Sequence, residues 1–349
     1  MQLIRHVRYV ERKRELKKRR SQKRLRKYRK LRTELTRKGI LVSAPEQLFL
    51  HGEGPHDALI GFIGRMRAAI SSGRSPVTLD FSATVSLMPG GALLFYAELD
   101  RVLSIYPSTS LRFLRSRNDT VNQVLEHLGV YMRGGYSSGA TPSREDVISW
   151  RVVASASSDG EVAGPLIETY ESLNAEDSKR LFRGVSEAIP NAVEHAYIDE
   201  RGDGIPPPPE NRWWMFCRES DNRFYVGVCD LGIGIPRSLP KTFSELFYSI
   251  FPAAVSPVVA KDDAAMIRAA MEISRTRTKL HERGKGLGDI RSVVDEIEGS
   301  ELYVFSNSGL VTYISGSYRL TRFNQSILGT LIVWIIPLKG SGHELKNGH

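Results

Sequence analysis

Apolar positions in the first half of the chain alternate between the 3.6-residue period of an amphipathic helix and short runs typical of strands. The pattern predicts helices at 58–70, 92–105 and 120–128 and strands at 47–50, 77–81 and 111–114. In the first helix one side is apolar, formed by Leu59, Phe62, Ile63, Met66 and Ile70. Strands and helices that alternate in this order predict a small, mainly parallel α/β sheet.

A loop rich in Gly, Ser and Pro at 134–143 separates this pattern from a second group of elements. The later pattern predicts helices at 178–197, 243–251, 262–273 and 287–298, and strands at 147–154, 213–218, 224–229, 302–305, 310–314 and 330–336. We expect these elements to form an α/β sandwich, in which one mixed sheet carries helices on one face.

The first 40 residues predict a basic helical arm. No glycine or proline occurs between residues 5 and 38, and four apolar residues form a thin helical stripe among Lys and Arg. This segment holds 18 of the 49 Lys and Arg residues but 3 of the 39 Asp and Glu residues, so its net charge is +15 and the rest of the chain carries −5. We expect the arm to order against an acidic surface, of which nucleic acid is the commonest. The alternative is a solvated tail without specificity.

These patterns divide the 349 residues into an arm (1–40), an α/β domain (41–135), a linker (136–145), an α/β sandwich (146–338) and a tail (339–349). The two cysteines, Cys217 and Cys229, fit neither a zinc motif nor a disulfide framework. No apolar run reaches the roughly 18 residues that cross a membrane, and the basic N-terminus lacks the apolar core of a signal peptide. We therefore expect a cytoplasmic protein without membrane contact.

Polar residues repeat at intervals of four along the helix predicted at 178–197. Glu187, Asn191 and His195 share one face beside small alanines, which suits the wall of a site better than a solvated surface. Pro190 lies inside this helix, where it removes one backbone hydrogen bond and clashes with the carbonyl of Ser186. We expect the helix to kink there, or its Glu187 end to tilt relative to Asn191.

Two glycine-rich turns follow. In the first, Asp230 ends a predicted strand, and Gly232 and Gly234 let the backbone approach a neighbour closely and adopt positive φ. The second runs Gly284-Lys285-Gly286-Leu287-Gly288 and opens the helix predicted at 287–298. Backbone N–H groups at a glycine-rich helix start form an anion site.

The helix and the two turns together resemble the nucleotide-binding boxes of the histidine-kinase-like (GHKL) ATPase superfamily. That superfamily includes type II topoisomerases, heat-shock chaperones, sensor kinases and mismatch-repair ATPases. The spelling Glu187-x-x-x-Asn191-Ala-x-x-His195-Ala-Tyr197 is most similar to the anti-sigma-factor serine kinases. The resemblance covers roughly the second half of the chain and implies a Bergerat ATP-binding fold over 146–338, with ATP and Mg²⁺ as cofactors and residues 236–283 as a lid.

The resemblance also implies a role for each matching residue. Asn191 would bind Mg²⁺, and Glu187 would orient and deprotonate the attacking water, or a substrate hydroxyl in the kinases. His195 would be structural or a neighbour of the phosphates. The carboxylate of Asp230 would accept a hydrogen bond from the adenine amino group, which selects adenine because a carboxylate cannot bond the keto oxygen of guanine.

The remaining matches concern the two ends of the nucleotide. The second glycine turn would bind the phosphates, with Lys285 at the γ-phosphate end. Thr330, in the motif Gly-Thr-x-Ile-x-Trp-x-Ile-Pro that ends at residue 337, matches the closing strand of the family, whose threonine lies near the adenine.

The segment from Leu79 to Leu94 resembles the STAS fold of anti-sigma-factor antagonists, in which a serine at a helix start is phosphorylated. Here Met88-Pro-Gly-Gly91 stands at that place without a hydroxyl, and Ser82, Thr84 and Ser86 lie upstream. The alternative is an unrelated small α/β domain. We expect an ATP-hydrolysing switch that regulates a protein or nucleic-acid partner. A serine/threonine protein kinase and a non-catalytic nucleotide-binding regulator remain alternatives, and the oligomeric state stays open.

Overall fold

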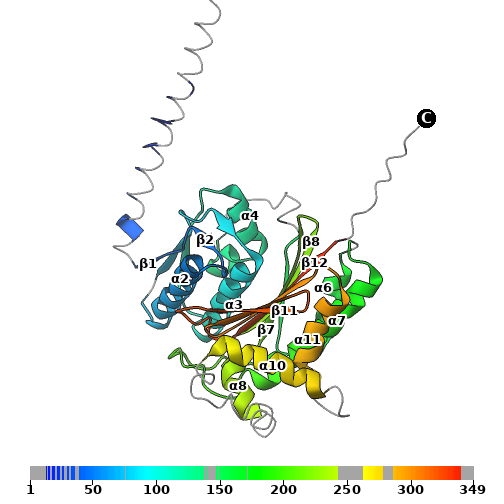
Figure 1. Ribbon diagram of the computed structural model, residues 1–349. Coiled ribbons are helices and arrows are strands. Elements are labelled where there is room, and N and C mark those ends of the chain that lie inside the picture. The colour runs from blue at the N-terminus through cyan, green and yellow to red at the C-terminus, as the bar shows by residue number, and fades with distance from the viewer. Residues whose placement is uncertain are drawn as a thin grey trace, which may run out of the picture.

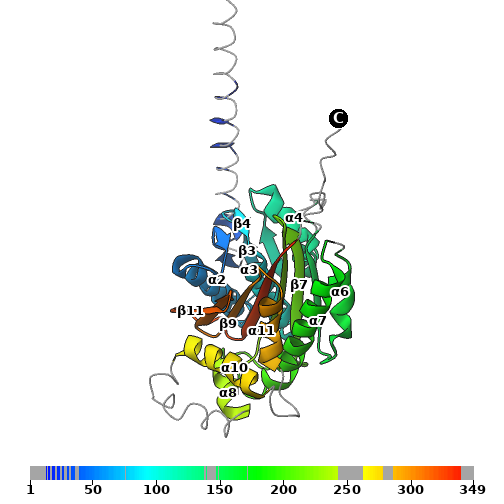
Figure 2. The ribbon, with the colours of Figure 1, turned by 45° about the vertical axis from the view of Figure 1, so that its right-hand side comes forward.

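The computed structural model describes residues 39–74, 76–136, 149–170, 172–242, 262–277 and 286–338, with residues 139 and 147 and scattered positions between 13 and 35. The protein is a mixed α/β structure built around one large sheet. Helices cover one face of this sheet, and the N-terminal region (residues 39–136) covers the other (Figures 1 and 2). Two sets of elements that are distant in sequence therefore share the same sheet.

Within the described residues, the large sheet has seven strands in the order β11-β10-β9-β12-β8-β7-β6. Their bounds are β6 Arg151–Ser155, β7 Trp213–Ser220, β8 Arg223–Asp230, β9 Glu301–Ser306, β10 Gly309–Ile314, β11 Ser317–Arg322 and β12 Thr330–Pro337. Each neighbouring pair is antiparallel, so the prediction of a mixed sheet was wrong. Tight turns account for two of these pairs, β7 with β8 and β10 with β11: both turn residues have positive φ at 221–222 and at 315–316, the geometry of two-residue hairpins.

On one face of this sheet lie α6 Gly164–Glu168, α7 Ala175–Pro190, α10 Asp263–Arg277 and α11 Gly286–Glu296; α8 Ile235–Thr242 packs against α10. The side chain of Asn174 begins α7 by accepting hydrogen bonds from the N–H groups of Glu176 and Asp177. The helices α7 and α11 approach closely at Gly184, where a Cβ would lie 2.6 Å from Cγ2 of Val293. Glycine at this position therefore permits the packing of the two helices.

The N-terminal region has a three-stranded sheet in the order β1-β3-β5, formed by Ile40–Ser43, Val77–Asp80 and Leu111–Leu114. All of its pairs are parallel, as is the short pair β2 Gln47–Leu48 with β4 Ser86–Leu87, so the predicted mainly parallel sheet is confirmed. The helices α2 Glu53–Ser71 and α3 Pro89–Ile105 connect successive strands, and α4 Asp119–His127 follows β5. A short 3-10 turn, η1 Tyr131–Gly134, ends the region.

Alternation along β7 divides the core between the two faces of the large sheet. Trp213 and Met215 pack against the helices α7 and α11, whereas Trp214 and Phe216 belong to the same apolar cluster as the N-terminal region. The contact with that region is made mainly by α3, which packs on β7, β8 and β12. A buried hydrogen bond of 2.9 Å from the indole N–H of Trp214 to Oδ2 of Asp100 on α3 fixes its position.

Several predicted segments lie wholly or mostly outside the described residues: the linker at 136–145, the helix at 243–251 and the tail at 339–349. The described positions between residues 13 and 35 of the arm are helical. Within the part of the chain that is described, no helix has both the length and the apolar character needed to cross a bilayer.

Candidate functional site

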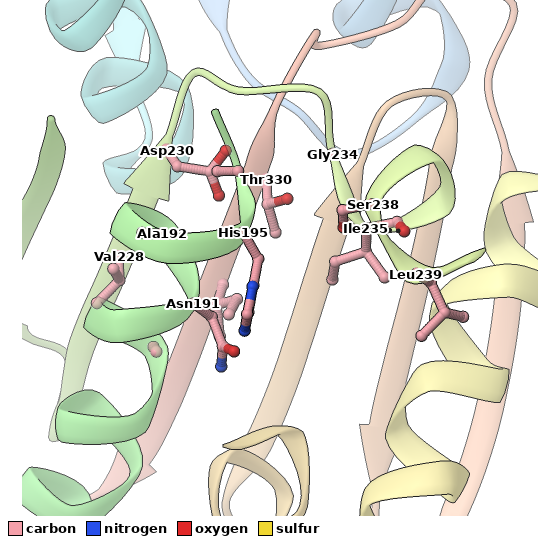
Figure 3. A pocket seen from close by; sticks show the side chains of 13 residues that line it. Asn191, Ala192, His195, Val228, Asp230, Gly234, Ile235, Ser238, Leu239 and Thr330 are labelled. Carbon is pink, nitrogen blue, oxygen red and sulfur yellow. Dashed lines mark hydrogen bonds between the residues drawn. The ribbon is translucent and has the colours of Figure 1, made fainter. Parts of the chain in front are cut away.

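A cavity with about 600 Å³ of empty space, including its open mouth, lies between the end of α7, the strands β8 and β12, and the start of α8 (Figure 3). Five of the residues singled out from the sequence line it: Asn191, His195, Asp230, Gly234 and Thr330. The rest of the wall is mainly apolar and consists of Ala188, Ala192, Ala196, Val228, Ile235, Ser238, Leu239 and Ile332.

Pro190 shapes one wall of this cavity. The α-helix ends at Pro190, and the next five residues, Asn191–His195, form a π-helical turn. Proline cannot donate a hydrogen bond to the carbonyl of Ser186, and its ring pushes that carbonyl away, so the helix widens instead of continuing. The predicted kink thus takes the form of a wider turn, a feature that is frequent at functional sites.

The polar side chains of the π-helical turn extend into the cavity. The amide Nδ2 of Asn191 donates to the backbone carbonyl of Glu187 at 2.7 Å, which leaves its Oδ1 directed toward the cavity (Figure 3). The imidazole of His195 lies on the same wall. Glu187 is half-buried one turn earlier on α7 and is not among the residues that line the cavity.

Asp230 stands at the end of β8 and is 7 % exposed. The N–H of Gly232 donates a hydrogen bond to Oδ1 of Asp230 at 2.9 Å. Thr330, which pairs with Asp230 from the neighbouring strand β12, also donates to the carboxylate. Burial raises the pKa of Asp230 from 3.8 to about 6, while the hydrogen bonds from Gly232 and Thr330 act in the opposite direction. A buried hydrogen-bond acceptor therefore stands in the wall of the cavity beside Thr330 (Figure 3).

The glycines of the turn after Asp230 have separate uses. A Cβ on Gly232 would lie 2.1 Å from the carbonyl oxygen of Ala196, so glycine allows this turn to pack on the end of the π-helical turn. The N–H of Ile233 then donates to the same carbonyl at 2.7 Å. Gly234 has a φ of +79°, as its place in the motif predicts, and a Cβ there would lie 2.7 Å from the side-chain amide of Asn307.

Polar groups that were not singled out as site residues support this arrangement. The hydroxyl of Tyr197 accepts a hydrogen bond of 3.2 Å from the N–H of Leu231 and donates to the carbonyl of Arg212. Ser306, at the end of β9, accepts from the N–H of Ile235 at 2.9 Å and lies 3.1 Å from the hydroxyl of Thr330. Tyr197 is the last residue of the motif that begins at Glu187, so the sequence could have identified it as a site residue. Ser306 belongs to no motif, so nothing in the sequence indicated it.

The second glycine turn is only partly described. The helix α11 begins at Gly286 and continues through Leu287 and Gly288, close to the predicted start, while Gly284 and Lys285 lie outside the described residues. Across the described residues, no three His, Cys, Asp or Glu side chains form a metal site. A metal ion in this cavity would therefore take the amide oxygen of Asn191 and complete its coordination with water and a bound ligand.

No protein-family model matches this chain, and no curated protein is similar to it in sequence. The chemistry of the site combines a buried hydrogen-bond acceptor, aliphatic walls, and an amide oxygen and an imidazole on one wall.

Proposed function

We propose that the protein binds ATP with Mg²⁺ in this cavity and acts as an ATP-hydrolysing switch of the Bergerat type in the cytoplasm, regulating a protein or nucleic-acid partner. The observation that carries the proposal is the position of Asp230. This buried carboxylate accepts hydrogen bonds from Gly232 and Thr330, and it also stands in the wall of a cavity with aliphatic walls, where a ligand that donates to it would further offset the cost of its burial. A flat heteroaromatic ring that carries an amino group satisfies both features.

If the 6-substituent of a purine lies at Asp230, the chemistry of this carboxylate favours adenine over guanine. The adenine amino group donates a hydrogen bond to a carboxylate, whereas the keto oxygen of guanine would face Asp230 as a second acceptor. Ionisation of Asp230 strengthens this preference, since a charged acceptor bonds a donor more strongly and repels an oxygen more strongly. Val228, Ile332 and Leu239 provide the apolar surfaces on which the ring would stack.

The phosphates would extend along the wall that carries Asn191 and His195. The Oδ1 atom of Asn191 is an oxygen ligand of the kind that Mg²⁺ prefers, and the bound metal would offset the phosphate charge. Glu187, one turn earlier on the same helix, would hold the attacking water and accept its proton. The π-helical turn thus carries the metal ligand, and the regular helix before it carries the base.

Hydrolysis is favoured over self-phosphorylation at Ser82 and Thr84 by the surroundings of these two hydroxyl groups. Ser82 and Thr84 are buried, and the hydroxyl of Thr84 donates to the carbonyl of Pro45 at 2.8 Å. The helix α3 begins at Pro89 after Met88, so its start carries no hydroxyl. A phosphate acceptor must reach the base, and these two buried side chains cannot do so.

Calorimetric titration with ATP and with GTP, each with Mg²⁺, tests the proposal. ATP should bind, GTP should bind at least tenfold more weakly, and Asp230→Ala or Asn191→Ala should abolish ATP binding. Asp80→Asn is the matched control, because Asp80 is also buried at the end of a strand and also accepts from the N–H two residues further on, that of Ser82 at 3.0 Å, but does not line the cavity. Equal affinity for ATP and GTP would contradict the role of Asp230.

A further inference from the structure

A buried network of charged side chains joins the N-terminal region to the segment that leads into the candidate site. At its centre lies Arg201, which is 8 % exposed. Its Nε donates to the carbonyl oxygen of Leu328 at 2.7 Å, its Nη1 donates to Asp203 at 2.9 Å, and both terminal nitrogens donate to Glu98. Burial opposes the charge, yet the carboxylate of Glu98 raises the pKa of Arg201 above its ordinary value.

Glu98 belongs to α3 and is fully buried. From α2, Nη1 of Arg67 donates to Glu98 Oε1 at 3.0 Å. Burial alone would raise the pKa of Glu98, but the guanidinium groups of Arg201 and Arg67 hold it below its ordinary value. A second ion pair joins α3 to the segment that contains Arg201, because Arg101 of α3 donates to Asp203 at 2.8 Å. The position of α3 therefore determines whether Arg201 keeps Glu98, which is one of its two countercharges beside Asp203.

Arg201 holds a turn with unusual backbone angles. Leu328 has a φ of +53°, which a residue with a branched side chain rarely adopts, and Gly329 has a φ of +143°. A Cβ on Gly329 would lie 2.4 Å from the carbonyl oxygen of Asp230, so the turn passes directly against the end of β8. The next residue, Thr330, begins β12 opposite Asp230. Arg201 thus fixes the backbone just before one of the two polar side chains at this end of the cavity.

We propose that Arg201 is a positioning residue for the nucleotide site and that Glu98 makes its action depend on the docking of α3. This inference rests on the function proposed above. A shift of α3 would remove Glu98 from Arg201, release the carbonyl of Leu328, and let Thr330 move relative to Asp230. Because coupling between two sites is reciprocal, nucleotide bound at Asp230 stabilises α3 in its docked position. The N-terminal region thereby responds to bound nucleotide, and its docking also changes the affinity of the site for nucleotide.

Affinity measurements on two variants test the first half of the proposal. Glu98→Gln keeps the size of the side chain and removes its charge, and we expect it to weaken ATP binding on the order of tenfold, within the range of coupled sites. Arg201→Lys should also weaken binding, since one ammonium cannot bond Leu328 and Glu98 with the fixed fork of a guanidinium. The matched control is Glu301→Gln, which removes a carboxylate 2.5 Å from Arg223 at the opposite end of β8 and should leave affinity unchanged.

Hydrogen exchange on the wild-type protein tests the second half and needs no variant to fold. Saturating ATP should slow exchange in residues 89–105 of α3, which do not line the cavity, more than in α4, residues 119–127. This difference should disappear in Glu98→Gln. If wild-type protein binds ATP but α3 is not slowed, or if folded Glu98→Gln binds ATP as tightly as wild type, the coupling is refuted. Failure of the wild type to bind ATP would instead refute the nucleotide site itself.

Discussion

Replacement of Asp230 by asparagine should stabilise the nucleotide-free protein while it weakens nucleotide binding. The carboxyl has a pKa of about 6 in the folded chain, above its ordinary value of 3.8. A carboxyl whose pKa is raised on folding destabilises the folded state once it ionises. This cost is absent below pH 3.8 and complete above about pH 6. The amide that replaces the carboxylate keeps an oxygen that can accept from Gly232 but carries no charge, so the variant avoids the cost.

The size of the effect follows from the two pKa values of Asp230. A rise from 3.8 to about 6 corresponds to about 3 kcal/mol at neutral pH. Changes in hydrogen bonding to Thr330 offset part of this gain by about 1 kcal/mol, a term that does not vary with pH. The pH-dependent part is therefore the sharper quantity. The stability advantage of Asp230→Asn should shrink by about 1.4 kcal/mol between about pH 8 and about pH 5, because the wild-type carboxyl becomes protonated.

Urea denaturation followed by tryptophan fluorescence at these two pH values measures this difference, and calorimetry at the higher pH measures the affinity for ATP. We expect the variant to gain stability and lose ATP affinity. This result would show that the charge of Asp230 destabilises the folded protein but contributes to ATP binding. An advantage that is the same at both pH values, or a variant less stable than wild type at the higher pH, would refute the argument that burial of this carboxylate opposes folding.

Three further predictions concern the turn, the chemistry and the arm. Gly232→Ala should prevent the turn from packing on Ala196, since its Cβ would lie 2.1 Å from that carbonyl oxygen, and should abolish ATP binding in a filter assay. Glu187→Ala should keep ATP binding but stop release of phosphate from γ-labelled ATP. In the wild type the chain should stay unlabelled, and label on Ser82, Thr84 or Ser86 would favour the kinase alternative. Deletion of residues 1–38 should remove affinity for nucleic acid together with its salt dependence, and unchanged affinity would make the arm only a tail.

Much of the fold could be predicted because several of its helices are amphipathic and most strands of the large sheet are rich in apolar residues. The predicted strand at 111–114 has the observed bounds, and α3 begins three residues before the predicted start. The strands β1 and β11 were missed: β1 directly follows the basic arm, and β11 is an edge strand rich in polar residues. Strand direction in the large sheet also could not be deduced, since apolar period does not report it; for β7 with β8 and for β10 with β11 it follows from the turn geometry at 221–222 and 315–316.

The candidate site was predictable where backbone constraints require particular residue types. Gly234 needs a positive φ, and the polar spacing of Asn191 and His195 survives the change to a π-helical turn. The apolar half of the cavity was not predicted, because nothing in the local pattern separates Ile235 and Leu239, which line it, from aliphatic residues that fill the core. The Glu98–Arg201 pair was equally hidden, since its members are 103 residues apart and meet only in the folded chain.

The adjacent tryptophans Trp213 and Trp214, directed to opposite faces of one sheet, limit how this protein can be divided or recombined. A gene fragment that encoded only the strands and helices of the second half would leave Trp214, Phe216 and Val333 exposed as an aggregation-prone surface. The N-terminal region and the large sheet with its helices must therefore be expressed and purified as one chain. For the same reason, a movement of α3 that affects the site has to be a shift along the large sheet that keeps the sheet covered. Full separation of α3 from the sheet would expose an apolar face to water.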